Sequence, residues 1–389
     1  MSAGPADVSA RFLMKVKLES KDIRRIVVRG TNWVGDAVMT VPALRELRRL
    51  LPHAHITLAA RAFAEGIFKG ADFLDDLLLY DREPDESSSV FQKARAWRDR
   101  SFDLAVLFQN AFEAALIAWI ARVPNRIGYA TQRRGWLLTH PLPLPEWHGS
   151  RHESIYYLNI VAQLETLLHG ASKILDCEPV FDLYVAADRQ TEGRDILHAQ
   201  GVRDGSPIVA LCPGSINSRA KRWPAERYAA LADRFIEETG ANVLLIGSAA
   251  ELDVSLEVSK HMRREPLVLT GKTDLAQAVA ILSLVDLLVT NDTGPAHIAS
   301  ALGRPTLVVF GPTNPLTTRP LSRTAEIVRH PPDCAPCMLR DCPIDHRCMT
   351  AITPDEVFAR ACALSDKLQF VALGEKGAGD DKLKFVGHL

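Results

Sequence analysis

The sequence predicts an α/β protein with two Rossmann-like domains, each a doubly wound parallel sheet, and a cleft between them. The chain has 389 residues, a length that suits two domains of ordinary size. Short runs rich in β-branched residues and leucine alternate with segments of helical periodicity, which is typical of parallel βαβ units. This alternation starts twice, near residue 22 and again after about residue 187. We therefore predict one domain at 22–187 and a second at 188–352.

The first domain is expected to open on a β-branched run that ends at Gly30. Its predicted strands are the apolar runs 23–30, 56–59, 77–80 and 104–108. Its predicted helices are the segments 36–51, 90–100, 111–121 and 151–170. The proline-rich stretch 139–150 interrupts the pattern between the last two helices.

In the second domain, each predicted strand runs directly into a polar or glycine-containing loop. The predicted strands are 208–212, 242–246, 286–290 and 306–310, and the predicted helices are 224–239, 274–284 and 295–302. A final helix is expected within 353–373, while residues 1–21 and 374–389 are expected to be a disordered extension and a flexible tail. Ligands of open α/β sheets bind beyond the carboxyl ends of the strands, so these loops form the expected site.

The composition excludes several functional classes. Lys and Arg number 46 and Asp and Glu 47, giving a formal net charge of -1, whereas general nucleic-acid binders are far more basic. No apolar run reaches the roughly 18 residues of a membrane-spanning helix, and residues 1–20 lack an apolar core of signal-peptide length. We therefore expect no nucleic-acid partner and a cytoplasmic protein whose seven cysteines form no structural disulfides.

Two loops of the second domain have the chemistry of a phosphate site. Residues 291–297 join a strand to a helix, and the Asp292-Thr293-Gly294 start of that helix is suited to bind an anion, with His297 facing the same ligand. A plainly capped helix with a buried histidine is the alternative. Residues 213–224 combine Ser215 with Arg219, Lys221 and Arg222 and contain no acid, which suits a diphosphate, although a solvated basic loop remains open.

Two familiar nucleotide-binding patterns are missing from these loops. The 213–224 loop does not have the spacing of a P-loop, and no Gly-x-Gly-x-x-Gly follows the predicted strands. Both absences argue against a P-loop kinase and against a standard dinucleotide-dependent dehydrogenase.

The first domain offers a candidate base and a candidate anion site. Asp36 follows the first strand in a glycine-containing loop, where it is either a general base or an ordinary helix N-cap. Four arginines occur in a stretch without acids between Glu113 and Glu146, where they form either a site for an anionic acceptor or a basic surface loop. These arginines are Arg122, Arg126, Arg133 and Arg134.

Four cysteines lie close together near the end of the second domain. Cys334, Cys337, Cys342 and Cys348 have the spacing C-x2-C-x4-C-x5-C, and His346 is a spare ligand. In a reducing compartment this density favours a structural zinc site, although the spacing is tighter than in common zinc ribbons. Free thiols or a redox pair are the alternatives.

Several motifs together resemble the bacterial lipopolysaccharide heptosyltransferases of glycosyltransferase family 9, over roughly residues 23–370. In the first domain they are RGTNWVGD at 29–36 and TVPAL at 40–44. In the second domain they are PGS at 213–215, AKRWP at 220–224, GKT at 271–273 and NDTG at 291–294 with His297. The resemblance implies a GT-B fold, in which the first domain takes the acceptor, the second takes the nucleotide sugar, and the last helix returns to the first domain.

The resemblance also implies roles for individual residues. Asp36 is expected to be the catalytic base, and Lys221 is expected to contact the donor diphosphate. Donor contacts are expected from Ser215, Ser248, Glu251, Gly271, Lys272, Asp292, Thr293, Gly294 and His297, with Ser248 and Glu251 near the ribose and Gly271 and Lys272 near the adenosine. Acceptor contacts are expected from Asn32, Trp33, Gly35, Asn110, Arg126, Arg133 and Arg134.

The implied function is that of an inverting glycosyltransferase moving heptose from ADP-L-glycero-D-manno-heptose to the heptosyl-Kdo inner core of lipopolysaccharide. No metal is expected in catalysis, because cations and helix N-termini stabilise the leaving diphosphate. The acceptor is lipid-linked, which implies peripheral contact with the inner face of the inner membrane. Another core acceptor, a sugar-nucleotide epimerase and a non-catalytic nucleotide-sugar-binding protein remain alternatives.

Overall fold

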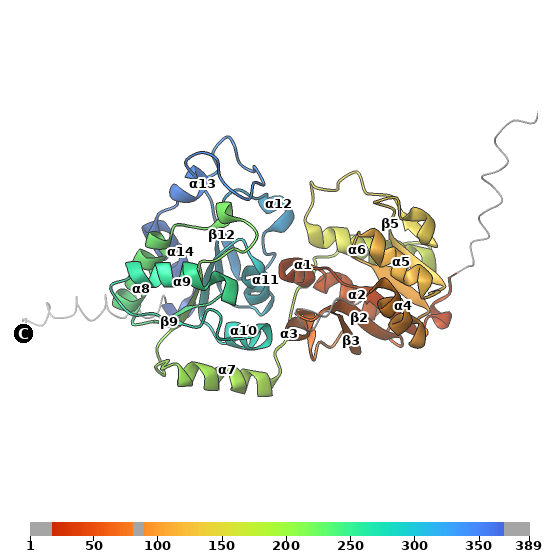
Figure 1. Cartoon of the computed structure of the whole chain (residues 1–389), viewed down its shortest axis with the longest axis horizontal. Coiled ribbons are helices and arrows are strands. Elements are labelled where there is room, and N and C mark those ends of the chain that lie inside the picture. The colour runs from red at the N-terminus through yellow and green to blue at the C-terminus, as the bar shows by residue number, and fades with distance from the viewer. Residues whose placement is uncertain (1–17, 81–88, 369–389) are drawn as a thin grey trace, which may run out of the picture.

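The computed structural model describes residues 18–80 and 89–368. Within these ranges the chain forms two lobes, each built on a six-stranded parallel sheet with helices on both faces (Figure 1). The strand order is β3-β2-β1-β4-β5-β6 in the first lobe and β9-β8-β7-β10-β11-β12 in the second. Both sheets therefore have the 3-2-1-4-5-6 order of a Rossmann fold, which confirms the predicted fold class.

The first lobe contains six strands and six α-helices in the described residues. The strands are β1 (Arg25–Arg29), β2 (His55–Arg61), β3 (Asp76–Tyr80), β4 (Leu104–Leu107), β5 (Asn125–Tyr129) and β6 (His140–Leu142). The helices are α1 (Val34–Met39), α2 (Val41–Leu50), α3 (Ala64–Phe68), α4 (Val90–Asp99), α5 (Phe112–Ile120) and α6 (Glu153–His169). A 3-10 turn, η3 (Gly135–Leu137), follows β5.

The second lobe has the same alternation. Its strands are β7 (Ile208–Cys212), β8 (Asn242–Leu245), β9 (Leu267–Val268), β10 (Leu287–Asn291), β11 (Thr306–Val309) and β12 (Ala325–Val328). Its helices are α7 (Ala187–Ala199), α8 (Ala225–Thr239), α9 (Leu252–His261), α10 (Leu275–Leu282), α11 (Gly294–Ala301), α12 (Pro315–Thr318), α13 (Arg347–Thr350) and α14 (Pro354–Leu364). The 3-10 turns η5 (Arg219–Lys221) and η6 (Ala249–Glu251) lie in its loops.

Two details of the first lobe differ from the sequence-based prediction. The single helix expected at 36–51 is divided at Thr40, because Pro42 lacks an N–H and begins a new helix in its first turn. The interrupted stretch 139–150 contains the edge strand β6, where Pro141 is tolerated because an edge strand needs fewer ladder hydrogen bonds.

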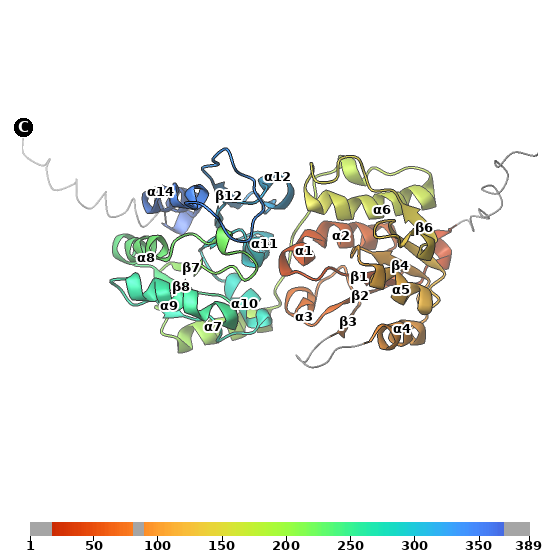
Figure 2. The same ribbon diagram turned by 45° about the horizontal axis from the view of Figure 1, so that its top comes forward.

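The termini of the folded region also bear on the predictions. Leu18 is buried in the first core and Ser20–Asp22 forms a 3-10 turn, while residues 1–17 and 369–389 lie outside the described residues. The expectation of a last helix that returns to the first lobe differs from the structure. Helix α14 packs on α8 and β11 of the second lobe, where Phe358 contacts Phe235 (Figures 1 and 2). Its buried face fills the second core and is not available to the first.

The two lobes are packed together through two helix pairs, α1 with α11 and α3 with α10. A Cβ atom added at Gly294, the first residue of α11, would lie 2.7 Å from Cγ1 of Val34 in α1. Only glycine permits this close approach, which sets the start of α11 against the start of α1. None of the helices in the described residues is long and apolar enough to cross a membrane.

Candidate active site

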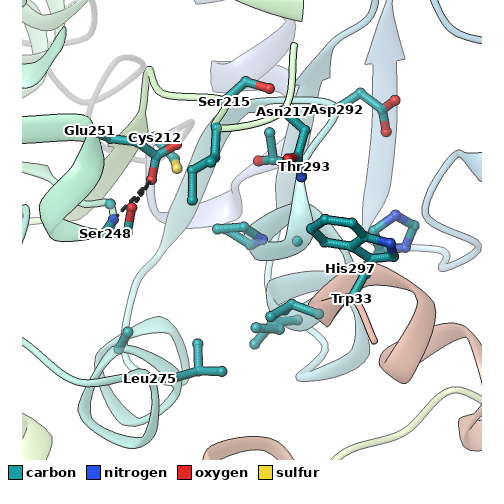
Figure 3. Close-up of a pocket in the computed structure, with 18 of the residues that line it drawn as sticks. Trp33, Cys212, Ser215, Asn217, Ser248, Glu251, Leu275, Asp292, Thr293 and His297 are labelled. Atoms are coloured by element: carbon teal, nitrogen blue, oxygen red, sulfur yellow. Dashed lines mark hydrogen bonds between the residues drawn. The ribbon is translucent and has the colours of Figure 1, made fainter. Parts of the chain in front are cut away.

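A cavity of about 490 Å³ lies between the lobes, at the carboxyl ends of the central strands. The first lobe contributes Met39 and the residues 33–36 that follow β1. The second lobe contributes the loops after β7, β8 and β10 together with the start of α10. In Figure 3, Ser248 and Glu251 lie at one end of this pocket, and Trp33 of the first lobe lies near His297 of the second. The two predicted loop sets therefore face one cavity, as the fold prediction requires.

Asp36 is not the N-cap of its helix, so the ordinary capping explanation for this residue fails. The N-cap of α1 is Trp33, and Asp36 lies in the first turn. Its carboxylate lines the pocket and has no hydrogen-bond or ion-pair partner among the described residues. Burial, reinforced by the negative charge of Glu153 and opposed by Lys221, raises the pKa of Asp36 to about 6. A half-buried, unpartnered carboxylate with this pKa is well suited to accept a proton near neutral pH.

Lys221 is held in the pocket by Asp292. The Lys221 ammonium donates to Oδ2 of Asp292 at 3.0 Å and to its backbone oxygen at 3.1 Å. The Asp292 carboxylate is 4% exposed and also accepts a 2.7 Å hydrogen bond from the Thr313 hydroxyl. Asp292 therefore fixes the Lys221 ammonium at the pocket wall, and its Oδ2 accepts hydrogen bonds from both Lys221 and Thr313.

Asn291 joins the two loops of the second lobe. Its side-chain amide donates to the backbone oxygens of Pro213 and Gly214, and its oxygen accepts from the Trp223 amide and the Tyr228 hydroxyl. Asn291 is fully buried, and these contacts satisfy both ends of its side chain. This network fixes the position of Ser215 and Lys221 relative to the start of α11.

The start of α11 opens into the pocket, as the sequence predicts. Thr293, in extended conformation, is the N-cap, and Thr293, Gly294 and His297 line the cavity. A helix N-terminus of this kind attracts phosphate through its free N–H groups and dipole. Burial lowers the pKa of His297 to about 4, so the ring is neutral at pH 7, and it makes no hydrogen bond to the described residues. His297 can thus donate or accept a hydrogen bond from a ligand without carrying charge.

Ser248 and Glu251 form a capping box at the start of η6 and line the far part of the pocket. Oε2 of Glu251 accepts hydrogen bonds from the Ser248 amide at 2.9 Å and from its hydroxyl at 2.8 Å. The other carboxylate oxygen lies against Gly214, where an added Cβ would be only 2.3 Å away. Both residues therefore cap η6, which the sequence analysis did not predict, and both also line the pocket.

Two predicted donor residues do not reach the cavity. Gly271, with φ +74°, turns the chain after β9, and Lys272 donates to Gln200 at 3.4 Å. The neighbouring residues Thr273 and Asp274 line the pocket instead. An adenosine contact from this loop would therefore involve Thr273 or Asp274 more directly than Lys272.

The predicted acceptor residues fall into two groups. Trp33 and Gly35 line the pocket, whereas Asn32 is not part of the lining and its side-chain oxygen accepts a hydrogen bond from Arg29. The other four lie outside the lining: Asn110, Arg126, Arg133 and Arg134.

Arg134 shows why the second group differs from the prediction. It is fully buried and donates to the backbone oxygens of Tyr129, Gln109 and Ala111 and to the side chain of Asn110. Arg126 likewise donates to the backbone oxygens of Leu137 and Val123. The guanidinium groups of both residues support loops of the first lobe and are not directed at the cleft, whereas Arg133 is exposed on the surface.

Sequence reasoning missed three residues that shape the site. Glu153, at the start of α6, raises the pKa of Asp36 although the two residues are 117 positions apart. Thr313 and Asn291 position Asp292 and the 213–224 loop. Asn291 belongs to the NDTG motif, but only its hydrogen bonds from the end of β10 to the loop after β7 show that it positions this loop. Glu153 and Thr313 have no local sequence signal.

The segment 334–348, which contains the four cysteines and is called the cysteine loop, makes hydrogen bonds to the loop that carries Lys221. The Ala220 amide donates to the Arg340 oxygen at 2.9 Å, and the His346 ring lies 2.7 Å from the Ala220 oxygen. Burial, followed by the charges of Cys337, Cys342 and Cys334, raises the pKa of the Cys348 thiol to about 11. Among the described residues, however, no group of three or more Cys, His, Asp or Glu side chains is arranged to hold a metal ion. The structural zinc site therefore stays a prediction.

Metal analysis of the purified protein tests this prediction. We expect about one zinc ion per chain, and we expect a chelator to lower the thermal stability of the protein, because Arg340 and His346 contact η5 at Ala220. Metal-free protein with four freely titrating thiols in this loop would contradict the prediction.

Comparison with known proteins supports a single family. The model of glycosyltransferase family 9 (heptosyltransferase) matches residues 90–347. The chain is 30% identical over 319 residues to lipopolysaccharide heptosyltransferase 2 of Salmonella typhimurium, covering 78% of this chain and 88% of that protein. It is 29% identical over 334 residues to lipooligosaccharide heptosyltransferase 2 of Haemophilus ducreyi, with the same coverage.

Solved structures share the two-lobed architecture. The chain is similar to E. coli ADP-heptose lipopolysaccharide heptosyltransferase II with a TM-score of 0.73 and 25% identity, over 90% of this chain and 99% of that chain. A family 9 glycosyltransferase from Veillonella parvula has the same fold, with a TM-score of 0.77 and 23% identity over 89% and 98% of the two chains. The family match spans both the 213–224 and the 291–297 loops of the pocket. The chain therefore belongs to glycosyltransferase family 9, the heptosyltransferases.

Proposed function

We propose that the protein is an inverting glycosyltransferase that moves heptose from ADP-L-glycero-D-manno-heptose to the heptosyl-Kdo inner core of lipopolysaccharide. The observation that carries this proposal is the unpartnered Asp36 carboxylate in the same pocket as Lys221 and the start of α11. A glycosyl transfer needs a base for the acceptor and a stabiliser for the departing diphosphate. The choice of sugar is supported by the heptosyltransferase 2 and ADP-heptose names of the relatives.

In the proposed reaction, Asp36 removes the proton from an acceptor hydroxyl as its oxygen attacks C1 of the heptose. A new C1–O bond forms while the bond between C1 and the β-phosphate oxygen breaks, and ADP leaves with that electron pair. Attack from the face opposite the departing phosphate inverts the configuration at C1. Lys221 and the N–H groups at the start of α11 stabilise the charge that develops on ADP, so the step as proposed needs no metal.

The donor is proposed to lie along the second lobe. Its diphosphate would contact Lys221, Ser215 and the residues Thr293 and Gly294, with neutral His297 contacting the sugar or phosphate. The ribose would lie near Ser248 and Glu251, since a carboxylate accepts hydrogen bonds from vicinal hydroxyl groups. Asp292 is proposed to act through Lys221, because its Oδ2 accepts hydrogen bonds from both Lys221 and Thr313.

The acceptor is proposed to enter from the first lobe beside Trp33 and Gly35. This acceptor carries a lipid anchor, so the protein is proposed to work as a peripheral protein at the inner face of the inner membrane.

The pH dependence of turnover reports on Asp36. The base has to be ionised to act, so we expect kcat/KM for the acceptor to rise with pH and to reach half of its plateau near the Asp36 pKa of about 6. The substitution Glu153→Gln removes a negative charge that raises this pKa, so the acid limb should move to lower pH. Initial rates at acceptor concentrations well below KM, measured from about pH 4.5 to about pH 8 to bracket the acid limb, check both expectations. An acid limb that does not move in Glu153→Gln would argue against Asp36 as the titrating base.

The release of ADP from ADP-heptose, measured with and without an inner-core acceptor, tests the proposed function. A transferase releases ADP only when the acceptor is present and yields a heptosylated product. A sugar-nucleotide epimerase changes the ADP-sugar without any acceptor, and a binding protein retains ADP-heptose unchanged in both reactions. Either of these last two results would overturn the proposal.

A further inference from the structure

Four large aromatic side chains lie exposed on one surface of the first lobe, and we call them the aromatic patch. Phe91 lies on α4, Phe112 and Trp119 lie on α5, and Trp136 lies on η3. The ring of Trp136 is 6.4 Å from that of Phe112 and 6.2 Å from that of Trp119 between centroids. Phe91 and Trp119 line the same shallow hollow, so the four rings form one continuous surface.

These rings are not needed to complete the core beneath them. The core under α4 and α5 is closed by Trp97, Ala115 and Ala118, which are fully buried. Above it, Phe91 is 72% exposed and Trp136 is 67% exposed. Single exposed apolar residues are normal on a protein surface, but a continuous group of large ones marks an interaction site.

The surroundings of the aromatic patch are basic. Arg98, Arg122 and Arg126 line the hollow that Phe91 and Trp119 share. The guanidinium of Arg122 has no hydrogen-bond or ion-pair partner among the described residues, so it is available to a ligand. Between positions 90 and 136, and leaving out the buried Arg134, seven basic residues stand against the three acids Asp99, Asp103 and Glu113. The basic residues are Lys93, Arg95, Arg98, Arg100, Arg122, Arg126 and Arg133.

The aromatic patch borders the acceptor side of the first lobe without forming part of the pocket. Strands β1, β4 and β5 are neighbours in the sheet, and the loops after their carboxyl ends lead to Asp36, Phe112 and Trp136 respectively. Helices α4 and α5 lie on the side of the lobe away from the second lobe in both views (Figures 1 and 2). A surface bound to the patch would therefore leave the cleft open while lying beside its acceptor-binding lobe.

We propose that the aromatic patch docks the protein on an anionic lipid bilayer. Tryptophan rings favour the boundary between headgroups and acyl chains, where the aromatic body is shielded and the indole N–H stays hydrated. Arg98 and Arg122 beside them bind lipid phosphates and favour anionic headgroups. This inference rests on the proposed function, because a lipid-linked acceptor requires the enzyme to meet a membrane. The combination of interfacial aromatics with the unpaired guanidinium of Arg122 favours a lipid surface over an acidic protein partner, which would not need an apolar patch of this size.

Vesicle binding tests the docking surface directly. Vesicles of phosphatidylethanolamine with phosphatidylglycerol should sediment the full-length protein, and vesicles of phosphatidylcholine alone should bind it more weakly. The double variant Trp119→Ser/Trp136→Ser should bind the anionic vesicles about tenfold less. Arg122→Asn should reduce the preference for anionic lipid, and asparagine tolerates the φ of +61° at this position. The matched control Tyr184→Ser/Leu256→Ser removes two exposed apolar side chains outside the patch and should bind like the unchanged protein.

Transfer assays separate docking from catalysis. With a deacylated, water-soluble acceptor, the tryptophan double variant should retain the unchanged turnover rate, whereas with the acceptor embedded in vesicles its rate should fall together with vesicle binding. Unchanged binding of the double variant to anionic vesicles overturns the proposal. A matching loss with the soluble acceptor also overturns it, since the patch would then bind the acceptor's sugars. Absence of transfer by the unchanged protein with either acceptor counts against the proposed function, while vesicle binding still decides the docking surface.

Discussion

Replacing Asp36 with asparagine is expected to lower kcat about 10²- to 10⁴-fold, the range of a lost general base. The amide has nearly the same shape as the carboxylate but cannot take a proton from the acceptor hydroxyl. The carboxylate has no hydrogen-bond partner among the described residues, so the substitution breaks no internal contact and should leave the fold intact. Burial raises the pKa of Asp36, which means the folded protein holds this charge at some cost, so the variant should be at least as stable as the unchanged protein.

Steady-state rates and thermal unfolding of the same preparations check this expectation. Affinity for ADP should change by less than about threefold, since Asp36 is assigned to the acceptor and not to the donor. Glu65→Gln, which neutralises an exposed carboxylate on α3 of the same lobe, is a matched control and should retain full turnover. Full turnover of the Asp36→Asn variant would remove this residue from the mechanism.

Lys221→Ala is expected to weaken ADP binding about 10- to 100-fold, the range of a lost hydrogen bond to a charged group. The ammonium is held by Asp292 and is 26% exposed, so it faces the cavity from a fixed position. The substitution also leaves the Asp292 carboxylate nearly buried, with the Thr313 hydroxyl as its remaining side-chain donor. Because an unpaired buried charge is costly, the variant should also unfold at a lower temperature.

A second substitution separates these two effects. Lys221→Ala/Asp292→Asn removes the unpaired charge and should recover much of the lost stability, but ADP binding should stay weak. The control Arg219→Ala removes a cation from the same turn, where it makes an exposed pair with Asp341, and should change ADP affinity little. Calorimetric titration with ADP measures all three variants. Unchanged ADP affinity in Lys221→Ala contradicts the donor assignment, whatever happens to stability.

The strands and helices that the sequence predicts well are those with strong periodic signals. The runs 208–212 and 104–108 are almost wholly apolar because helices cover both faces of each parallel sheet, and they became β7 and β4. Two strands at one end of the first sheet were missed for the opposite reason. The residues of β5, NRIGY, and of the edge strand β6, HPL, include polar, glycine and proline residues that a propensity argument rejects.

Some residues of the candidate site could be predicted from the sequence, and others could not. Asp36, Lys221 and Thr293 follow directly from their place after predicted strands, because parallel strands bring such loops to one edge. Local sequence does not reveal which polar groups are already engaged by the protein. Arg134 stands in a basic stretch without acids that suggests an anion-binding loop, yet its guanidinium is buried and donates to backbone oxygens. Glu153 could not be found at all, since its effect on Asp36 depends on how α6 packs beside α1.

The aromatic patch could not be predicted from the sequence either. Trp119 and Trp136 are 17 positions apart and belong to different elements, so no amphipathic periodicity connects them in the sequence. They meet because β5 and η3 return the chain to the side of α5.

The central claim is that this cleft adds heptose to an inner core that already carries one heptose. The most direct test supplies ADP-heptose together with lipid A–Kdo acceptors that carry no, one or two heptoses, and identifies the products by mass spectrometry. We expect one heptose to be added to the acceptor with a single heptose, with little product from the other two. Addition only to the acceptor without heptose, or no addition to any of them while ADP-heptose binds, would contradict it.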